Sequence, residues 1–432
     1  MKKIYMYSFM AAMFAAAVTG CGSKTNTDGT ITSDNQVTTS IAAEANDSVS
    51  LVQLSNISVS DESSDEASFT NRDLSQTADT SNAQNITVSD GETIDITDEG
   101  VYVISGTAEN CTIRVEADKN AKVQLVLDGV SITNSSFPAI YVVSADKVFI
   151  TTTDSENTLT VSGQFTSDGE TNTDAVIFSK DDLVLNGTGT LNVTSYYGNG
   201  ITSKDDMKIT GGTYNIKSAL DAFEANDSIS VSDGTFNITT NKDGFHCEND
   251  NTEGTITISG GTFSINGKSD GIQACALLQI DGGTFDITAA EGLEATYILI
   301  NDGEINIYAT DDGINASAGT NAYETAIKIN GGNINVEVGQ GDTDAIDSNG
   351  SIYVNGGTIN VTAQMSSFDY DMNAEFNGGT IIINGTQVDS IPQSMMGGGI
   401  NGGMSGGMSG GMNGGMNGGM NGGMSGGRGG RF

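Results

Sequence analysis

The chain has no tryptophan, only two prolines and a single histidine among its 432 residues. Basic residues are also scarce, with 17 Lys and Arg against 55 Asp and Glu, so the net charge is −38. Nucleic-acid binding needs a basic face, and this balance excludes nucleic acid as a partner. A strongly acidic surface is typical of a protein that stays well solvated or gathers cations.

Arginine and histidine are too rare for several kinds of catalysis. Arginine occurs only at positions 72, 114, 428 and 431, which disfavours a lyase that uses an arginine base in the repeats described below. A Ser-His-Asp triad would need His246, and this residue falls at an ordinary outward position of the repeat, where we expect a neutral surface role. Lysine bases and paired carboxylates leave a polysaccharide lyase or glycoside hydrolase open as an alternative.

The first twenty residues have the pattern of an export signal. Lys2 and Lys3 precede an apolar run of about ten residues, which is too short to span a bilayer. The run ends in Val18-Thr-Gly-Cys21, which resembles a bacterial lipobox. We therefore predict that residues 1–20 are a lipoprotein signal peptide and that Cys21 carries the lipid. The protein would then be extracellular and held on the bacterial membrane only through this anchor.

Two segments show no apolar periodicity. Residues 21–84 are rich in Ser, Thr, Asn and Asp, which predicts a disordered tether. Residues 394–432 repeat Gly-Gly-Met with Ser or Asn, which predicts a disordered tail. Outside the signal region the cysteines are Cys111, Cys247 and Cys275, and three cannot all pair, so we expect small buried thiols.

Residues 85–393 contain a repeat of about 22 residues. One unit reads Asp270-Gly-Ile-Gln-Ala, then Leu278-Gln-Ile, then Gly282-Gly-Thr-Phe-Asp-Ile. Short alternating strands at a fixed period predict a β-solenoid, because each coil can bury its Ile, Val and Phe only against the next coil. The Gly-Gly pairs are typical of turns that need positive φ. The units start at Asp174, Asn199, Asp221, Asp243, Asp270, Glu291, Asp312 and Asp344.

Stacking places equal positions of successive units in columns. The unit starts form the first column, and the residues three positions later form the second: Ile177, Thr202, Glu224, His246, Gln273, Glu294, Asn315 and Asp347. Carboxylates at the strand spacing repel one another, and two arrangements relieve this.

In the first arrangement, each aspartate caps a turn by accepting backbone N–H bonds. In the second, Ca²⁺ bridges adjacent coils through oxygen ligands. We favour calcium, because turn capping does not need the second column. The candidate ligands are Asp221, Glu224, Asp243, Asp270, Glu291, Glu294, Asp312, Asp344 and Asp347.

Several segments resemble a known family. They are Leu125-Val-Leu-Asp-Gly-Val-Ser-Ile-Thr-Asn, the repeated Asp-Gly-Ile-x-Ala, and Asp344-Ala-Ile-Asp-Ser-Asn-Gly-Ser-Ile-Tyr-Val-Asn-Gly-Gly. They are similar to the cellulose- and pectin-binding, calcium-containing parallel β-helix family of bacterial surface lipoproteins. The resemblance implies an all-β, right-handed parallel β-helix shaped like pectate lyases, with bound Ca²⁺ and non-catalytic binding of plant-type polysaccharide. Handedness rests on the resemblance, since the period does not show it.

Aromatic side chains usually stack on sugar rings, and the repeat leaves few for that role. The Phe of the Gly-Gly-Thr-Phe segments are predicted to be core. The tyrosines at turns or insertions are the candidate carbohydrate-binding residues: Tyr196, Tyr197, Tyr323 and Tyr370. The sequence thus predicts a Ca²⁺-stabilised polysaccharide-binding protein on the cell surface. A structural or adhesion protein is a further alternative, and the oligomeric state is left open.

Overall fold

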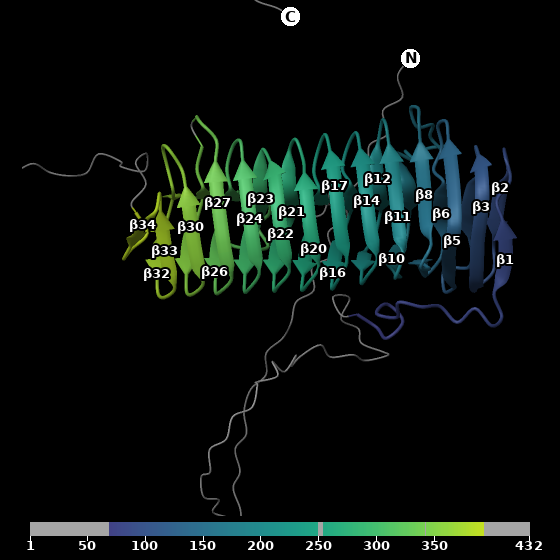
Figure 1. Ribbon diagram of the computed structural model, residues 1–432, viewed down its shortest axis with the longest axis horizontal. Coiled ribbons are helices and arrows are strands. Elements are labelled where there is room, and N and C mark those ends of the chain that lie inside the picture. Colours follow the sequence, from purple (N-terminus) through teal and green to yellow (C-terminus); the bar gives the residue numbers. More distant parts are fainter. Residues whose placement is uncertain (1–68, 249–253, 342, 393–432) are drawn as a thin grey trace, which may run out of the picture. The chain divides into compact units, whose positions relative to one another are not determined.

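The computed structural model describes residues 69–248, 254–341 and 343–392. These residues form 34 strands and no helix, so none of their segments has the helical length and hydropathy that crossing a membrane requires. The coils stack along one axis (Figure 1), as the repeat predicts. The predicted signal peptide, Cys21, most of the tether and the tail from residue 394 lie outside the described residues.

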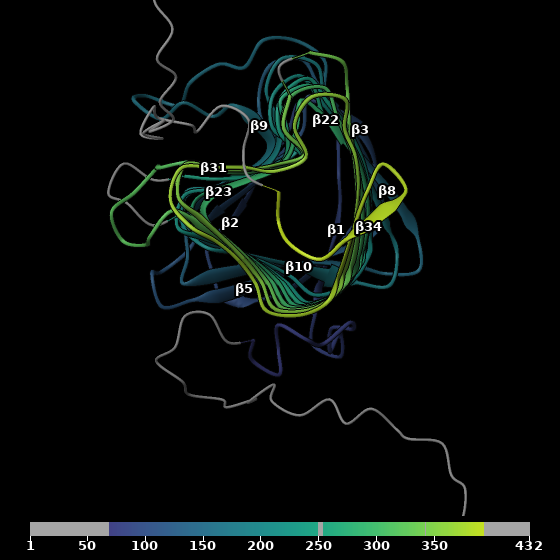
Figure 2. The ribbon, with the colours of Figure 1, turned by 90° about the vertical axis from the view of Figure 1, so that its left-hand side faces the viewer.

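The coils form a right-handed parallel β-helix, so the handedness implied by the family resemblance is confirmed. The face toward the viewer in Figure 1 has its strands pointing upward, and Figure 2 shows that face on the right, with the C-terminal coils nearest the viewer. The chain therefore turns counter-clockwise as it approaches the viewer, which is a right-handed coil.

Each full coil contributes to three parallel sheets, in the chain order III, I, II. Sheet I contains β1 (Gln84–Thr87), the first parts of β3 (Gly100–Glu109) and β5 (Lys122–Asn134), β7 (Lys147–Thr152), β10 (Asp182–Gly187), β13 (Met207–Ile209), β16 (Ser228–Val231), β19 (Thr255–Ile258), the second parts of β21 (Asp270–Ile280) and β23 (Glu291–Ile300), β26 (Ala326–Ile329), β29 (Ser351–Val354) and β32 (Ala374–Phe376).

Sheet II forms the face toward the viewer in Figure 1. It contains the second parts of β3 and β5, then β8 (Glu156–Val161), β11 (Thr190–Ser195), β14 (Thr213–Ser218), β17 (Thr235–Thr240), β20 (Thr262–Asn266), β22 (Thr284–Ala289), β24 (Glu304–Ala309), β27 (Asn333–Val338), β30 (Thr358–Thr362), β33 (Thr380–Ile383) and the antiparallel β34 (Thr386–Val388).

Sheet III carries the start of each repeat unit. It contains β2 (Thr93–Ile96), β4 (Thr112–Glu116), β6 (Ile140–Ser144), β9 (Ala175–Ser179), β12 (Asn199–Ser203), β15 (Phe223–Ala225), β18 (Phe245–Cys247), the first parts of β21 and β23, β25 (Ile314–Ala316), β28 (Ile346–Ser348) and β31 (Asp369–Tyr370).

The core consists of inward side chains that stack coil upon coil. Phe236, Phe263 and Phe285 occupy equal positions of neighbouring strands, and their ring centroids lie 4.6 and 4.5 Å apart. All three are essentially fully buried, which confirms that these Phe are core. Parallel stacking of flat rings in a dry interior removes a large apolar area from water at every coil.

Glycine serves two purposes in the repeat. Gly283, the second of a Gly-Gly pair, has φ +109°, a conformation that L side chains rarely adopt, as predicted for these turns. Gly271, which follows the unit-start aspartate, has ordinary φ, but a Cβ there would collide with the Ile287 side chain and the backbone oxygen of Gly292. The Asp-Gly motif therefore marks a place where sheets II and III approach closely.

The early repeat at Asp174 has a different register from the one we expected. Ala175 pairs with Asn199, and Phe178 pairs with Thr202, so assigning Ile177 to the second column is wrong. Ile177 points inward instead, where it stacks between Ile140 and Ile201. The unit at Asp174 is shifted by one residue relative to the later units, and the shift keeps Ile177 in the column of core Ile residues. The spacing of the unit starts in the sequence does not reveal this shift.

The end of the predicted tether lies against sheet I. The Arg72 guanidinium lies 4.4 Å from the centroid of the Phe149 ring, and Asp73 is fully buried. Gln76 accepts a hydrogen bond from the Gly187 N–H at 2.9 Å and donates one to the Thr210 carbonyl at 2.9 Å. Ordered contacts with the β-helix thus begin before residue 85.

We expect Phe263→Ala to lower the free energy of unfolding by about 3–5 kcal/mol, because it leaves a cavity between two stacked rings. Urea unfolding followed by circular dichroism measures the change. Tyr196→Ala, at a side chain that is 61% exposed, is the matched control and should shift the midpoint little. Equal shifts for the two variants would contradict the buried aromatic column.

Candidate functional site

Two rows of side chains run along sheet III, and together we call them the acidic ladder. The first row consists of the unit starts from Asn199 to Asp344. The second row is in register as predicted from Thr202 onward, and it extends by one further residue, Asp369. Its members pair in the order Thr202, Glu224, His246, Gln273, Glu294, Asn315, Asp347 and Asp369.

The first row caps the backbone of the next coil. The Asp243 N–H donates to Asp221 Oδ1 at 3.0 Å, and the Asp270 N–H donates to Asp243 Oδ1 at 2.9 Å. Asn199 and Asp312 accept in the same way, from the N–H groups of Asp221 and Asp344 at 2.9 and 2.8 Å. Capping is therefore present at Asn199, Asp221, Asp243 and Asp312, and each acidic cap uses only one of its two carboxylate oxygens for it.

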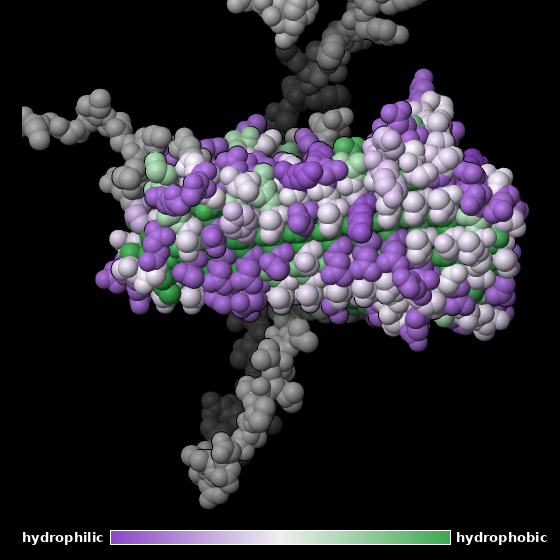
Figure 3. All heavy atoms as spheres, turned by 45° about the horizontal axis from the view of Figure 1, so that its top comes forward, coloured by the Kyte–Doolittle hydropathy of each residue, from purple (hydrophilic) through white to green (hydrophobic). Residues whose placement is uncertain are grey.

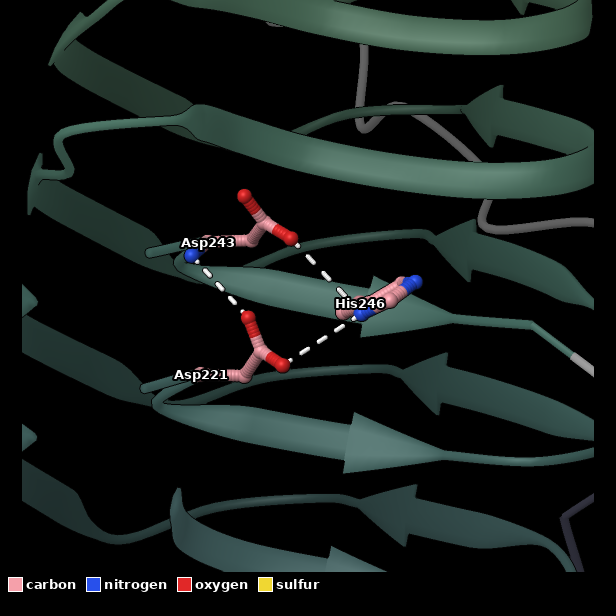
Figure 4. A group of neighbouring side chains, drawn as sticks. All are labelled: Asp221, Asp243 and His246. Atoms are coloured by element: carbon pink, nitrogen blue, oxygen red, sulfur yellow. Dashed lines mark hydrogen bonds and ion pairs between the residues drawn. The ribbon is translucent and has the colours of Figure 1, made fainter. Parts of the chain in front are cut away.

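In the N-terminal half of the ladder, a lysine provides the countercharge. Lys242 Nζ lies 2.8 Å from Asp221 Oδ2 and 3.7 Å from Asp243 Oδ2. Figure 4 shows Asp221 and Asp243, from neighbouring coils, both directed toward His246, whose Nδ1 lies 3.4 and 3.6 Å from their Oδ2 atoms. One ammonium group therefore offsets the charge of one of these two almost fully buried carboxylates, and burial together with the charge of Asp221 raises the pKa of Asp243.

The ionisation of this group follows from these contacts. Burial opposes the charged form of Asp221, but hydrogen bonds from His246 and Lys242 outweigh it and lower the pKa of this carboxyl. Burial likewise disfavours protonated His246, yet the hydrogen bond and charge of Asp221 raise the pKa of the imidazole. The surface role expected for His246 is wrong, because its side chain is only 13% exposed and contacts three carboxylates, those of Asp221, Asp243 and Glu248.

A second lysine, Lys204, forms an ion pair with Glu224. Lys204 Nζ lies 3.0 Å from Glu224 Oε1, while Thr202 Oγ1 donates to Glu224 Oε2 at 2.9 Å. The Asn199 amide also donates to Glu224 Oε2. The chain's own lysines and amides thus contact the carboxylates of the ladder as far as Asp243.

Beyond Asp243 the internal cation is missing. Asp270, Glu291 and Glu294 each offer an oxygen, and these atoms all lie within 4.8 Å of one another. Among the described residues, no Lys or Arg forms an ion pair with any of the three. Residues at the position of Lys242 in the following units are Ser269, Ala290, Asp311 and Thr343.

Burial and neighbouring negative charges raise the pKa values of two of these carboxyls, Asp270 and Glu291. Burial, followed by repulsion from Asp243, Glu291 and Glu294, raises the pKa of Asp270 to about 8. Burial also raises the pKa of Glu291 to about 7, although the Asn315 amide donates to its Oε2 at 2.9 Å and opposes the rise. In solution without a cation, these groups remain partly protonated near neutral pH.

A raised carboxyl pKa is also found in the last coils. Burial and the charges of Asp312, Asp344 and Asp369 raise the pKa of Asp347 to about 7.

Around Glu294, the Gln273 amide donates to Oε2 at 2.6 Å and the Ser317 hydroxyl donates to Oε1 at 2.8 Å. The possible metal ligands of this half are oxygens of carboxylate, amide and hydroxyl groups, which are the ligands that a hard cation such as Ca²⁺ prefers.

The predicted carbohydrate-binding tyrosines do not share one surface. Tyr196 and Tyr197 are 61% and 54% exposed at the turn after β11. Tyr323 lies between β25 and β26 and stacks on Tyr297, with ring centroids 5.9 Å apart. Tyr370, in β31, packs against the core.

Sequence reasoning missed Tyr308, which is 43% exposed at an outward position of β24 on sheet II. Alternation within Glu304-Ile-Asn-Ile-Tyr-Ala places it outward, and that signal was available in the sequence. The expected buried thiols are confirmed for Cys111 and Cys247, whereas Cys275 is a free thiol that is only half-buried.

The fold and the ladder define the class of protein: a parallel β-helix with an acidic ladder in which Asp270, Glu291 and Glu294 form no ion pair with a Lys or Arg of the described residues. Residues 90–343 and 297–413 match the family of carbohydrate-binding domain-containing proteins, and the chain belongs to that family.

A curated relative from Acetivibrio thermocellus, also described as a carbohydrate-binding domain-containing protein, is 37% identical over 142 residues. The matched part is 32% of this chain and 49% of the relative, so the chain spans about half the length of that relative. A solved structure of a polysaccharide lyase-like protein from C. thermocellum, a gadolinium derivative, matches with TM-score 0.34 and 23% identity. That match covers 72% of this chain and 97% of the other chain.

Without divalent cations, we expect stability to fall as the pH rises. Asp270, Glu291 and Asp347 have folded-state pKa values of about 8, 7 and 7, above the ordinary carboxyl values near 4. Between the ordinary carboxyl pKa and the folded-state pKa, the folded state binds more protons than the unfolded state, so raising the pH favours unfolding. The melting temperature in EDTA should drop by several degrees from about pH 5 to about pH 8.

Asp270→Asn should flatten this pH dependence, because it removes the carboxyl with the highest of the three values. Asp371→Asn, at an exposed position of the same end of the β-helix, is the control and should leave the slope unchanged. A slope in Asp270→Asn equal to that of the parent protein would contradict the assignment.

Proposed function

We propose that this protein is a non-catalytic polysaccharide-binding β-helix of the bacterial cell surface, stabilised by Ca²⁺ in the C-terminal half of the acidic ladder. Family membership supports carbohydrate binding. The cell-surface location follows from the predicted lipoprotein signal and Cys21, and cellulose- or pectin-like plant polysaccharide is the ligand class that the family resemblance implies.

The observation that carries the calcium proposal is the change of countercharge along one ladder. Lys242 forms ion pairs with the buried Asp221 and Asp243, whereas the buried Asp270 and the half-buried Glu291 and Glu294 form no ion pair with a Lys or Arg of the described residues. A buried group of like charges is costly unless it is protonated or neutralised. When Ca²⁺ is bound, it would supply that charge through Asp270, Glu291 and Glu294, with Asp312, Asp344 and Asp347 supplying oxygens further along.

A polysaccharide lyase is the second candidate. The specific observation in its favour is the buried His246, which lies beside Lys242, Asp221 and Asp243 and borders a cavity of about 130 Å³ with Glu248 and Glu294. The same contacts raise the pKa of Lys242, because the hydrogen bond and charge of Asp221 outweigh burial, and this makes the ammonium a poor base. Ultraviolet absorbance of unsaturated uronic acid products would detect this activity.

Retention on immobilised glycans tests the binding function. We expect the protein to be retained on at least one of cellulose, pectin and neutral plant polysaccharides, more weakly after EDTA treatment, because loss of Ca²⁺ loosens the β-helix. Added Ca²⁺ should restore retention. Absence of retention on every glycan would overturn the proposal.

Calorimetric titration tests the calcium sites. We expect Ca²⁺ to bind the parent protein and Asp270→Asn to bind at least tenfold more weakly, since a ligand and its charge are lost. Lys242→Gln should show the opposite effect and gain a calcium-dependent rise in melting temperature, because Asp221 and Asp243 lose their ammonium. Unchanged calcium binding in Asp270→Asn would count against this location of the site.

A further inference from the structure

Sheet II carries two parallel rows of outward side chains, away from the acidic ladder on sheet III. The first row includes Asn215, Asn237, Asn306, Asn335 and Asn360. The second includes Lys217, Thr239, Asn266, Tyr308, Glu337 and Thr362. On the side of the molecule drawn in Figure 3, a stripe of apolar residues runs along the helix axis with hydrophilic side chains on both sides.

A shallow channel lies between the two rows. One hollow of about 280 Å³ is lined by Asn306, Tyr308, Asn335 and Glu337, among others. A second, of about 430 Å³, is lined by residues of the same two rows further toward the N-terminus, including Lys217 and Asn237. Because they share the rows, these hollows are successive parts of one feature, which we call the sheet II channel.

The first row offers regularly spaced hydrogen-bonding groups. Asn335 Nδ2 donates to Asn306 Oδ1 at 2.9 Å, and Asn237 Nδ2 donates to Asn215 Oδ1 at 2.8 Å. Within this row, Asn215 and Asn335 each donate one hydrogen bond and accept one, so that a second N–H and a second lone pair remain on each amide. Polar side chains recur at the strand spacing of about 4.8 Å, with Ser264 and Asp286 between Asn237 and Asn306, and this suits a hydroxyl-rich polymer lying along the helix axis.

Tyr308 supplies the flat apolar surface that the amides lack. Its side chain stands at the edge of the channel and is 43% exposed, whereas the neighbouring Ile307 and Val336 are buried and present mainly their backbone to the channel floor. An exposed ring beside a row of amides matches a sugar, which has an apolar ring face and hydroxyls on its rim.

The charge at the Tyr308 end of the channel selects among polysaccharides, whereas the hollow nearer the N-terminus is lined by Lys217 and by no carboxylate of the described residues. Asp286 and Glu337 line the hollow that contains Tyr308, and no Lys or Arg is among the described residues that line it. Carboxylates accept hydrogen bonds from sugar hydroxyls, but they repel the carboxylates of a uronic acid polymer.

We propose that the sheet II channel binds an uncharged polysaccharide chain running along the helix axis, with Tyr308 stacked on a sugar ring. This inference rests on the proposed polysaccharide-binding function and adds to it the binding face and the class of polysaccharide.

Native gels containing a glycan test the proposal with the whole protein in Ca²⁺. The probes are hydroxyethylcellulose, glucomannan and xyloglucan as uncharged polymers and polygalacturonate as the charged one. At least one uncharged polymer should retard the parent protein, and Tyr308→Ala should weaken that affinity about tenfold. Tyr353→Ala, on sheet I, is the matched control and should bind like the parent; melting curves verify that both variants are folded.

Charge reversal provides a second, independent measurement. Glu337→Lys should gain retardation by polygalacturonate, whereas Glu375→Lys, with the same charge change on sheet I, should not. If the parent protein binds no glycan, the proposed function fails. If the parent binds but neither Tyr308→Ala nor Glu337→Lys changes binding, the channel is wrong while the function stands. If the parent binds only polygalacturonate, the class of polysaccharide is wrong.

Discussion

In-register stacking of parallel coils is the constraint on which the rest of this structure depends. Parallel strands pair with the same position of the next repeat, so a residue type that recurs in the repeat forms a column of like side chains. A column of Ile or Phe is favourable, because neighbouring coils bury each other's apolar surface. For Asp and Glu it is unfavourable, because like charges are brought together and partly removed from water.

The acidic ladder shows how the chain handles that conflict. One oxygen of several unit-start carboxylates caps a backbone N–H of the next coil, which gives each acid a structural purpose. Lys204 and Lys242 form ion pairs with carboxylates of one half, whereas no lysine of the described residues forms an ion pair with Asp270, Glu291 or Glu294 in the other. The same fold therefore contains carboxylates beside lysine ammonium groups and a group of three that needs protons or an external cation. Burial raises the pKa of Asp243 in the first region as well as that of Asp270 in the second, to about 8 for Asp270.

Two faces of the β-helix have different chemistry. Sheet III gathers buried carboxylates, whose oxygens point toward one another and are suited to a small cation. Sheet II presents amides, hydroxyls and Tyr308 toward solvent, where a polymer has room to lie. This separation means that a cation bound at sheet III would leave free the surface of sheet II that a polysaccharide would contact. The docked segment from Arg72 to Gln76 covers part of the third face, sheet I.

The sequence by itself determined the solenoid, the inward Phe column and most of the second ladder row, because a period near 22 residues converts directly into register. It failed at Ile177, where a one-residue shift preserved the Ile core, and at Tyr308, which looked like an ordinary strand residue. The sequence also left capping and cation binding as alternatives. Only the tertiary structure showed that capping uses one oxygen, that Lys242 lies across two coils, and that His246 is nearly buried. Those outcomes depend on where long side chains from different coils meet, and a linear pattern does not specify such distances.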